Sequence, residues 1–154
     1  MRISLADEAA TTALGRAIAP VLRPGDAVLL DGPLGMGKST LARGLIRALA
    51  GEDVDVPSPT FTIVQFYETA PPVAHFDLYR LERPSEAAEV GLDESLDLGC
   101  ALIEWPERLG GDPEVWLGPD RLTIRLEEDG AGRVATVSGV GRWEDALKEI
   151  HVRS

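Results

Sequence analysis

The sequence predicts one α/β domain with a mixed parallel and antiparallel central sheet flanked by helices. Its 154 residues suit a single domain with a sizeable core. An apolar run at 27–32 passes through a glycine-rich turn into a helical pattern, which is a strand–turn–helix unit. Several short strand-like runs follow, and two of them alternate as the strands of an antiparallel hairpin do.

The first third of the chain is expected to hold two helices around the first strand. Ser4 and Asp7 have the spacing of a capping box, and apolar residues then recur at helical intervals, so a helix is expected over about 5–22. The run at 27–32 is of the buried-strand type. After the glycine turn a second amphipathic helix is expected, with Gly51 as its C-cap.

The rest of the chain is expected to supply the remaining strands. One or two short helices are expected within 84–98, and a final helix over 143–150 places Trp143 on the core. The turn "EDGAG" joins the last two strands into the antiparallel hairpin. The strands expected in this part cover 61–67, 73–79, 100–105, 121–128 and 133–140.

Composition restricts the classes of partner. The net charge is −11, from 15 basic and 26 acidic residues, and no basic run offsets it, so direct tight binding of RNA or DNA is disfavoured. No apolar run reaches the roughly eighteen residues of a membrane span, and the first residues lack the long apolar stretch of a signal peptide, so no membrane partner is expected. Cys100 is the only cysteine, which predicts no internal disulfide and a cytoplasmic location.

The turn before the second helix carries a phosphate-binding motif. Gly32, Gly37, Lys38 and Ser39 satisfy G-x-x-x-x-G-K-[ST]. The glycines let backbone N–H groups curl around a phosphate, and the positive end of the following helix faces the same anion. Lys38 can reach the terminal phosphates, and the hydroxyl of Ser39 can ligate Mg²⁺. The motif therefore predicts a P-loop NTPase-like domain, taken to span residues 1–154.

The turn has three other interpretations. A glycine-rich connection without a ligand is disfavoured, because a chance match in a chain of this length is expected in under about 1% of cases. A Ras-type GTPase would carry Asn-Lys-x-Asp, which is absent from a chain whose only lysines are Lys38 and Lys148. A small-molecule kinase usually adds a lid with several arginines, and Arg80 and Arg83 keep that alternative open.

Two acids end apolar strands that can lie beside the P-loop. Asp77 closes "VAHFD" and Glu104 closes "ALIE", which is where a P-loop enzyme needs carboxylates near its metal and its attacking water. The alternative makes Asp77 the cap of a turn and Glu104 a solvated strand end. His75 shares a strand face with Asp77 and is expected to be a hydrogen-bonded structural residue, with no zinc site.

A threonine-rich loop and a tryptophan complete the candidates. Ser58, Thr60 and Thr62 in "PSPTFT" carry hydroxyls that could contact a γ-phosphate or its Mg²⁺, although a plain proline-rich connection explains them equally well. Trp105 directly follows Glu104 and could lie against the nucleotide, or belong only to the core.

These segments together resemble a known family. "GPLGMGKSTLARGL", "SPTFTIVQFYE", "HFDLYRL" and "ALIEWPERL", in this order and spacing, resemble the TsaE (YjeE) family of small bacterial P-loop ATPases. "DEAATTALGRAIA" and the C-terminal hairpin also fit its outline, so the match covers nearly the whole chain. The resemblance implies an ATPase that acts with the TsaD–TsaB complex in the tRNA threonylcarbamoyladenosine pathway. That complex modifies the adenosine beside the anticodon in tRNAs reading ANN codons, and tRNA would be met mainly through it.

The resemblance also implies roles for single residues. Ser39 and Glu104 would ligate Mg²⁺. Asp77 would assist hydrolysis, as a base or by holding a metal-bound water, with Lys38 on the phosphates and Thr60 in a switch loop. The family often has threonine where this chain has Ser39, which keeps the hydroxyl. The residues expected to bind ATP are Thr11, Gly35, Met36, Gly37, Lys38, Ser39, Thr40, Trp105 and Arg133. Two other functions stay open, a small-molecule kinase and a nucleotide-regulated binding module whose hydrolysis is incidental.

Overall fold

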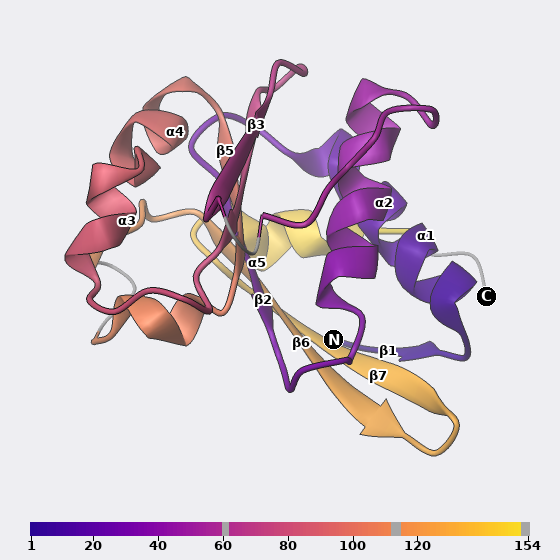
Figure 1. Cartoon of the computed structure of the whole chain (residues 1–154). Coiled ribbons are helices and arrows are strands. Elements are labelled where there is room, and N and C mark those ends of the chain that lie inside the picture. The colour runs from indigo at the N-terminus through magenta and orange to yellow at the C-terminus, as the bar shows by residue number, and fades with distance from the viewer. Residues whose placement is uncertain (60–61, 112–114, 152–154) are drawn as a thin grey trace.

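The computed structural model of the chain describes residues 1–59, 62–111 and 115–151. Within these residues one seven-stranded sheet forms the centre, in the order β1-β7-β6-β2-β5-β4-β3 (Figure 1). β2 runs parallel to both of its neighbours, β5 and β6, and β4 runs parallel to β5, while the other pairs are antiparallel. The strands are β1 (Arg2–Leu5), β2 (Ala27–Asp31), β3 (Val64–Tyr67), β4 (Val73–Asp77), β5 (Cys100–Glu104), β6 (Arg121–Asp129) and β7 (Gly132–Val140).

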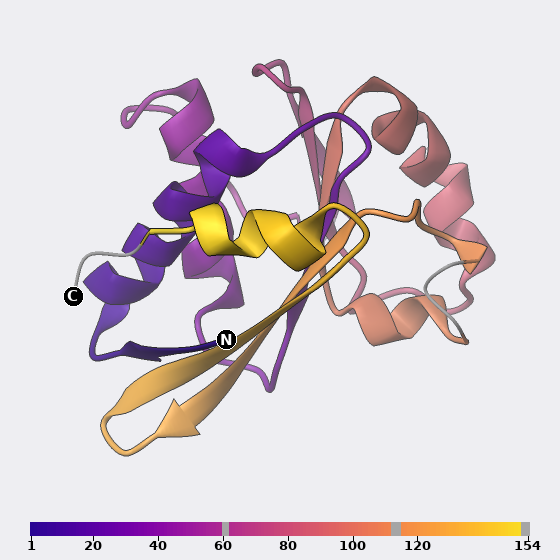
Figure 2. The ribbon, with the colours of Figure 1, turned by 180° about the vertical axis from the view of Figure 1, so that it is seen from behind.

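Helices cover both faces of the sheet. α1 (Glu8–Ile18) and α2 (Lys38–Ala50) lie side by side on one face, and α3 (Ser85–Glu89) and α4 (Leu92–Leu98) lie on the other (Figure 1). α5 (Trp143–Ala146) packs on the side of α1 (Figure 2). No helix among the described residues is long and apolar enough to cross a membrane. The 3₁₀ helices formed by described residues include η1 (Ala19–Val21), η2 (Pro106–Leu109) and η4 (Leu147–Glu149).

The core is divided by the sheet into two apolar layers. Along β2, Val28 and Leu30 point into the layer of α1 and α2, whereas Ala27 and Leu29 point into the opposite layer. A parallel strand buried on both faces needs apolar residues at every position, which explains the unbroken apolar run in the sequence. This arrangement fixes β2 at the centre, with its carboxyl end opening directly into the glycine turn.

The mixed parallel and antiparallel α/β architecture predicted from the sequence is confirmed, but the predicted first helix was wrong at its amino end. Arg2–Leu5 form β1, which pairs antiparallel with β7, and α1 begins only at Glu8. Asp7 is the N-cap of α1, and its side chain accepts a hydrogen bond from the N–H three residues on, at 2.9 Å. Ser4, the expected partner in a capping box, lies within β1. Four residues are too few to show a strand period, and β1 depends on the edge that β7 offers.

Most later expectations hold with shifted ends. The second helix ends at Ala50 with Gly51 as its C-cap, and β6 and β7 form the expected hairpin. The strand expected over 61–67 is β3, which starts at Val64, and residue 61 lies outside the described residues. The segment 84–98 forms α3 and α4, and the final helix is divided between α5 and η4.

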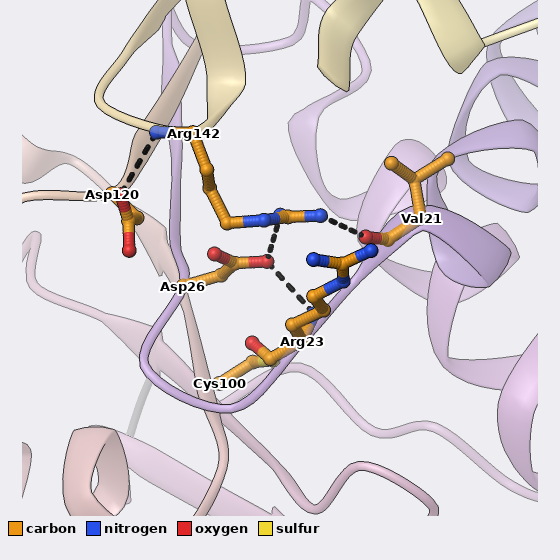
Figure 3. Close-up of polar contacts among 6 residues, drawn as sticks. All are labelled: Val21, Arg23, Asp26, Cys100, Asp120 and Arg142. Atoms are coloured by element: carbon orange, nitrogen blue, oxygen red, sulfur yellow. Dashed lines mark hydrogen bonds and ion pairs between the residues drawn. The ribbon is translucent and has the colours of Figure 1, made fainter. Parts of the chain in front are cut away.

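A buried ion pair fastens the C-terminal segment to the amino end of the central strand. Arg142 Nη1 lies 2.7 Å from Asp26 Oδ2, and the same oxygen accepts the Arg23 N–H at 2.8 Å (Figure 3). Arg142 also donates to the carbonyl of Val21 at 3.0 Å and, through its backbone N–H, to Asp120 at 2.9 Å (Figure 3). Burial raises the pKa of Asp26, while the Arg23 N–H and the Arg142 charge oppose that shift. The ion pair therefore compensates a carboxylate that has no exposed surface.

Arg142→Met is expected to lower the free energy of unfolding by about 3–5 kcal/mol, because it leaves the buried carboxylate of Asp26 without its ion partner. Urea denaturation at neutral pH measures this loss. In an Asp26→Asn background the same substitution should cost clearly less, since no buried charge remains. An equal cost in both backgrounds would contradict the ion-pair interpretation.

The same substitution should change the pH dependence of stability. A raised pKa means that the folded state holds the Asp26 proton more tightly than the unfolded state, so the contribution of Asp26 declines as pH rises above the ordinary value of 3.8. Removing the Arg142 charge should raise this pKa further and widen the interval over which stability falls. Denaturation of the wild type and of Arg142→Met at several acidic pH values measures the difference.

Candidate functional site

The glycine turn between β2 and α2 has the backbone of a P-loop. Gly32, Gly35 and Gly37 have φ values of +135°, +81° and +104°, in the region that favours glycine. At Gly32 a Cβ would also lie 2.3 Å from the carbonyl oxygen of Leu126 in β6, so no side chain fits there. α2 begins at Lys38, directly after the turn, and directs the unpaired N–H groups of its first turn toward the carboxyl edge of the sheet.

Lys38 lies across the mouth of this turn. Its side chain is buried, its Nζ donates to the carbonyl of Gly32 at 2.6 Å, and Nζ lies 3.3 Å from the centroid of the Trp105 ring. Burial lowers the pKa of Lys38, and nearby carboxylates, with Glu104 foremost, oppose that shift. A bound polyphosphate would oppose it in the same way, because negative charge beside an ammonium stabilises the protonated form.

The two predicted acids meet beside the P-loop. Asp77 and Glu104 are register partners at the ends of β4 and β5, and both are buried. Glu104 Oε1 accepts a hydrogen bond from Ser39 Oγ at 3.1 Å, which joins the end of β5 to the first turn of α2. Glu104 Oε2 lies 2.6 Å from His75 Nε2. The alternative of a solvated strand end for Glu104 is therefore wrong.

Asp77 has the capping contact that the alternative interpretation foresaw and also faces the site. Its Oδ1 accepts a hydrogen bond from the backbone N–H of Tyr79 at 3.0 Å, which fixes the turn after β4. The same side chain lines a hollow of about 320 Å³ together with Ser39, Glu104 and Trp105. A capping contact and a place in the site are compatible, because the turn bond holds the carboxylate in one orientation.

Hollows lie on both sides of the P-loop. The first, of about 320 Å³, contains the acids and Lys38. The second, of about 270 Å³, lies between the P-loop, α1 and the turn of the β6–β7 hairpin. The residues expected to bind ATP and the two acids each line one of the two. Of the threonine-rich loop, Ser58 lines the first hollow and Thr62 lines neither, and Thr60 lies outside the described residues. The second hollow contains Thr11, Gly35, Met36, Gly37, Thr40 and Arg133.

The donors in the first hollow fit Mg²⁺ bound together with phosphate. Mg²⁺ prefers hard oxygen ligands, and the Ser39 hydroxyl and the Glu104 carboxylate supply two of them within 3.1 Å of each other. Among the described residues, no group of three histidine, cysteine or acidic side chains could hold a metal alone. Mg²⁺ characteristically takes one or two protein oxygens and completes its shell with phosphate oxygens and water, which matches this partial set.

Sequence reasoning missed the side chains that stack behind Trp105. The Tyr79 ring lies 5.0 Å from the ring of Trp105, and the Arg108 guanidinium lies 5.4 Å from Tyr79. Trp105 itself has φ +60°, a conformation that is uncommon for residues other than glycine and that is found in turns and at active sites. The position of Tyr79, two residues after an aspartate, is a signal for the observed turn. Nothing in the sequence indicates the backbone of Trp105.

Comparisons with known proteins show the family of this chain. The sequence model of "Threonylcarbamoyl adenosine biosynthesis protein TsaE" matches residues 5–135. The chain belongs to the TsaE family. "tRNA threonylcarbamoyladenosine biosynthesis protein TsaE" of Streptomyces coelicolor is 42% identical, over 86% of this chain and 93% of its own. The Bacillus subtilis protein of that name is 36% identical, over 91% of this chain and 87% of its own.

A solved structure supports the same fold. A crystal structure of YdiB from Bacillus subtilis superimposes with a TM-score of 0.76 at 30% identity, covering 97% of this chain and 93% of that one. The superposition extends over nearly the whole length of both chains. A chain of the TsaE family therefore has this sheet order and this P-loop. The family is named for the biosynthesis of threonylcarbamoyladenosine in tRNA.

Gly32→Ala is expected to lower the free energy of unfolding by about 2–5 kcal/mol, because it adds the cost of positive φ to a clash with the Leu126 carbonyl. Gly35→Ala is the matched control, since its φ is also positive but a Cβ there meets nothing within 4 Å. The control should cost only about 1–2 kcal/mol. Chemical denaturation of both variants measures the difference, and equal losses would contradict the close packing at Gly32.

Proposed function

We propose that this protein is a Mg²⁺-dependent, weak or partner-activated ATPase that serves threonylcarbamoylation of the adenosine beside the anticodon in tRNAs reading ANN codons. It acts on the TsaD–TsaB complex and is not itself the threonylcarbamoyl transferase. The observation that carries the proposal is the convergence of the P-loop lysine and serine with two strand-end carboxylates in one hollow of a TsaE-family chain. P-loop nucleoside triphosphatases use these groups for phosphoryl transfer to water.

The side chains divide the work of hydrolysis. Lys38 and the N–H groups of the turn hold the phosphates, and Ser39 and Glu104 hold the metal ion. The metal ion held there would supply positive charge against the phosphate oxygens. Asp77, oriented by the Tyr79 N–H at 3.0 Å, positions the attacking water or accepts its proton.

The second hollow suits the remainder of the nucleotide. It adjoins the P-loop through Gly35, Gly37 and Thr40, which also line the first hollow. A nucleotide whose phosphates lie in the turn would therefore place its ribose and base between α1 and the hairpin. The polar side chains that line it from those elements are Glu8 and Thr11 of α1 and Arg133 of the hairpin.

The negative charge of the chain supports the proposal that its partners, and not the chain itself, contact the tRNA. A net charge of −11 repels the phosphates of tRNA, so contact with tRNA is made mainly through TsaD and TsaB. ATP binding and hydrolysis then reset the complex between turnovers. Metabolite phosphorylation has less support, because Arg83, one of the two expected lid arginines, contacts Ser85 and Glu89 on its own segment.

ATP hydrolysis by the chain should rise when TsaD and TsaB are added, and multiple-turnover modification of tRNA should require the chain together with ATP. The measurements are phosphate release and threonylcarbamoyladenosine formation over many turnovers. A chain that binds no ATP, or that leaves repeated turnover unchanged, would contradict the proposal. Full repeated turnover with a non-hydrolysable ATP analogue would instead support the nucleotide-regulated binding module.

Lys38→Ala should abolish ATP binding, because it removes the cation that holds the phosphates. Asp77→Asn and Glu104→Gln should retain much of the binding and lose hydrolysis, by about 10²–10⁴-fold if Asp77 acts as the general base. Calorimetric ATP binding and steady-state phosphate release separate the two effects, and thermal unfolding verifies that each variant folds. Unaltered turnover in both acid variants would refute their assignment.

A further inference from the structure

The carboxylate of Glu104 is held from two sides. Its Oε1 accepts from Ser39 Oγ at 3.1 Å, at the P-loop, and its Oε2 lies 2.6 Å from His75 Nε2, within the sheet layer. The His75 and Glu104 side chains are only 2% and 3% exposed. A short hydrogen bond to a charged group, such as the one between His75 and Glu104, is stronger when it is buried than when it is in water.

The pairing has a defined direction. An ionised carboxylate only accepts hydrogen bonds, so His75 must supply the proton at Nε2. Among the described residues, His75 Nδ1 has no hydrogen-bond partner. A ring with a proton on Nε2 satisfies Glu104, and the nitrogen without a partner, Nδ1, then needs no acceptor. The local structure therefore selects one tautomer, and with it one direction for the Glu104 carboxylate.

The strand positions explain how the pair arises. His75 lies two residues before Asp77 on β4, and β4 pairs with β5, which ends at Glu104. His75, Asp77 and Glu104 therefore share one sheet face, with His75 one step deeper than the two acids. From that position the imidazole contacts Oε2 of Glu104, while Oε1 contacts Ser39 at the P-loop.

We propose that His75 is a positioning residue for metal binding, which holds Glu104 so that Oε1 is presented to Ser39 and to Mg²⁺. The proposal rests on the function proposed above. A glutamate has three side-chain torsions, and a partner on one oxygen limits the directions that the other can take. Hydrogen-bond partners of metal-ligating groups typically change metal affinity or activity by about 10–100-fold when removed.

A purely structural histidine gives a different expectation from a positioning one. Loss of buried packing lowers the unfolding temperature but leaves the metal requirement of the folded protein unchanged. Loss of positioning raises the Mg²⁺ concentration needed for tight nucleotide binding, even in protein that stays folded. The dependence of nucleotide affinity on Mg²⁺ is therefore the deciding measurement, and it does not depend on catalysis.

The experiment compares His75→Leu and His75→Gln with the wild type by calorimetric titration of a non-hydrolysable ATP analogue, in EDTA and at increasing Mg²⁺. His75→Leu removes the donor, whereas His75→Gln places an amide N–H₂ group at similar reach. We expect His75→Leu to raise the half-saturating Mg²⁺ concentration by about 10–100-fold while affinity in EDTA is retained. His75→Gln should recover most of the wild-type response.

Val73→Ala is the matched control, because it removes buried apolar contact from the same strand and the same sheet layer as His75. It should lower the unfolding temperature and leave the Mg²⁺ response at its wild-type value. A wild-type response in His75→Leu, an impaired response in His75→Gln equal to that of His75→Leu, or an equal shift in Val73→Ala would each overturn the role of His75. Failure of the wild-type chain to bind the analogue would overturn the proposed function first, and the inference with it.

Discussion

The parallel pairing of β2, β5 and β4 is the constraint on which the site depends. Parallel strands end at a common edge, so the P-loop after β2 and the acids that end β4 and β5 come together there. The register matters as much as the order. In an alternating strand a slip of one residue would turn Glu104 to the opposite layer, away from Ser39 and His75.

Two sets of buried polar groups lie at the two ends of this parallel core, and each contains one close pair of charged or hydrogen-bonding side chains. At the carboxyl edge Lys38, Glu104 and His75 are buried and contact one another or the P-loop backbone. At the amino edge the Asp26–Arg142 pair ties the last helical segment to the start of β2. Burial raises the pKa of the Cys100 thiol at that edge to about 12, so Cys100 stays protonated and packs as an apolar residue. The groups of the candidate site and the ion pair that anchors the C-terminal segment therefore lie at opposite ends of the strands.

Sequence reasoning predicted much of the architecture but not the contacts inside the site. It identified the strand–turn–helix unit, the hairpin and the two strand-end acids, because each rests on a local pattern of residues. It missed β1, since four residues carry no detectable period and need β7 as a partner. It also treated His75 and Glu104 separately, because nothing in either segment indicates which strands lie side by side.

The sequence by itself determined the P-loop, because a phosphate-binding turn depends on consecutive residues whose backbone freedom and side-chain chemistry are local properties. Gly32 through Ser39 carry that information without help from the rest of the chain. Only the tertiary structure decided what faces the turn. The Ser39–Glu104 and His75–Glu104 contacts join residues 65 and 29 positions apart, and sheet order and register alone place them within hydrogen-bonding distance.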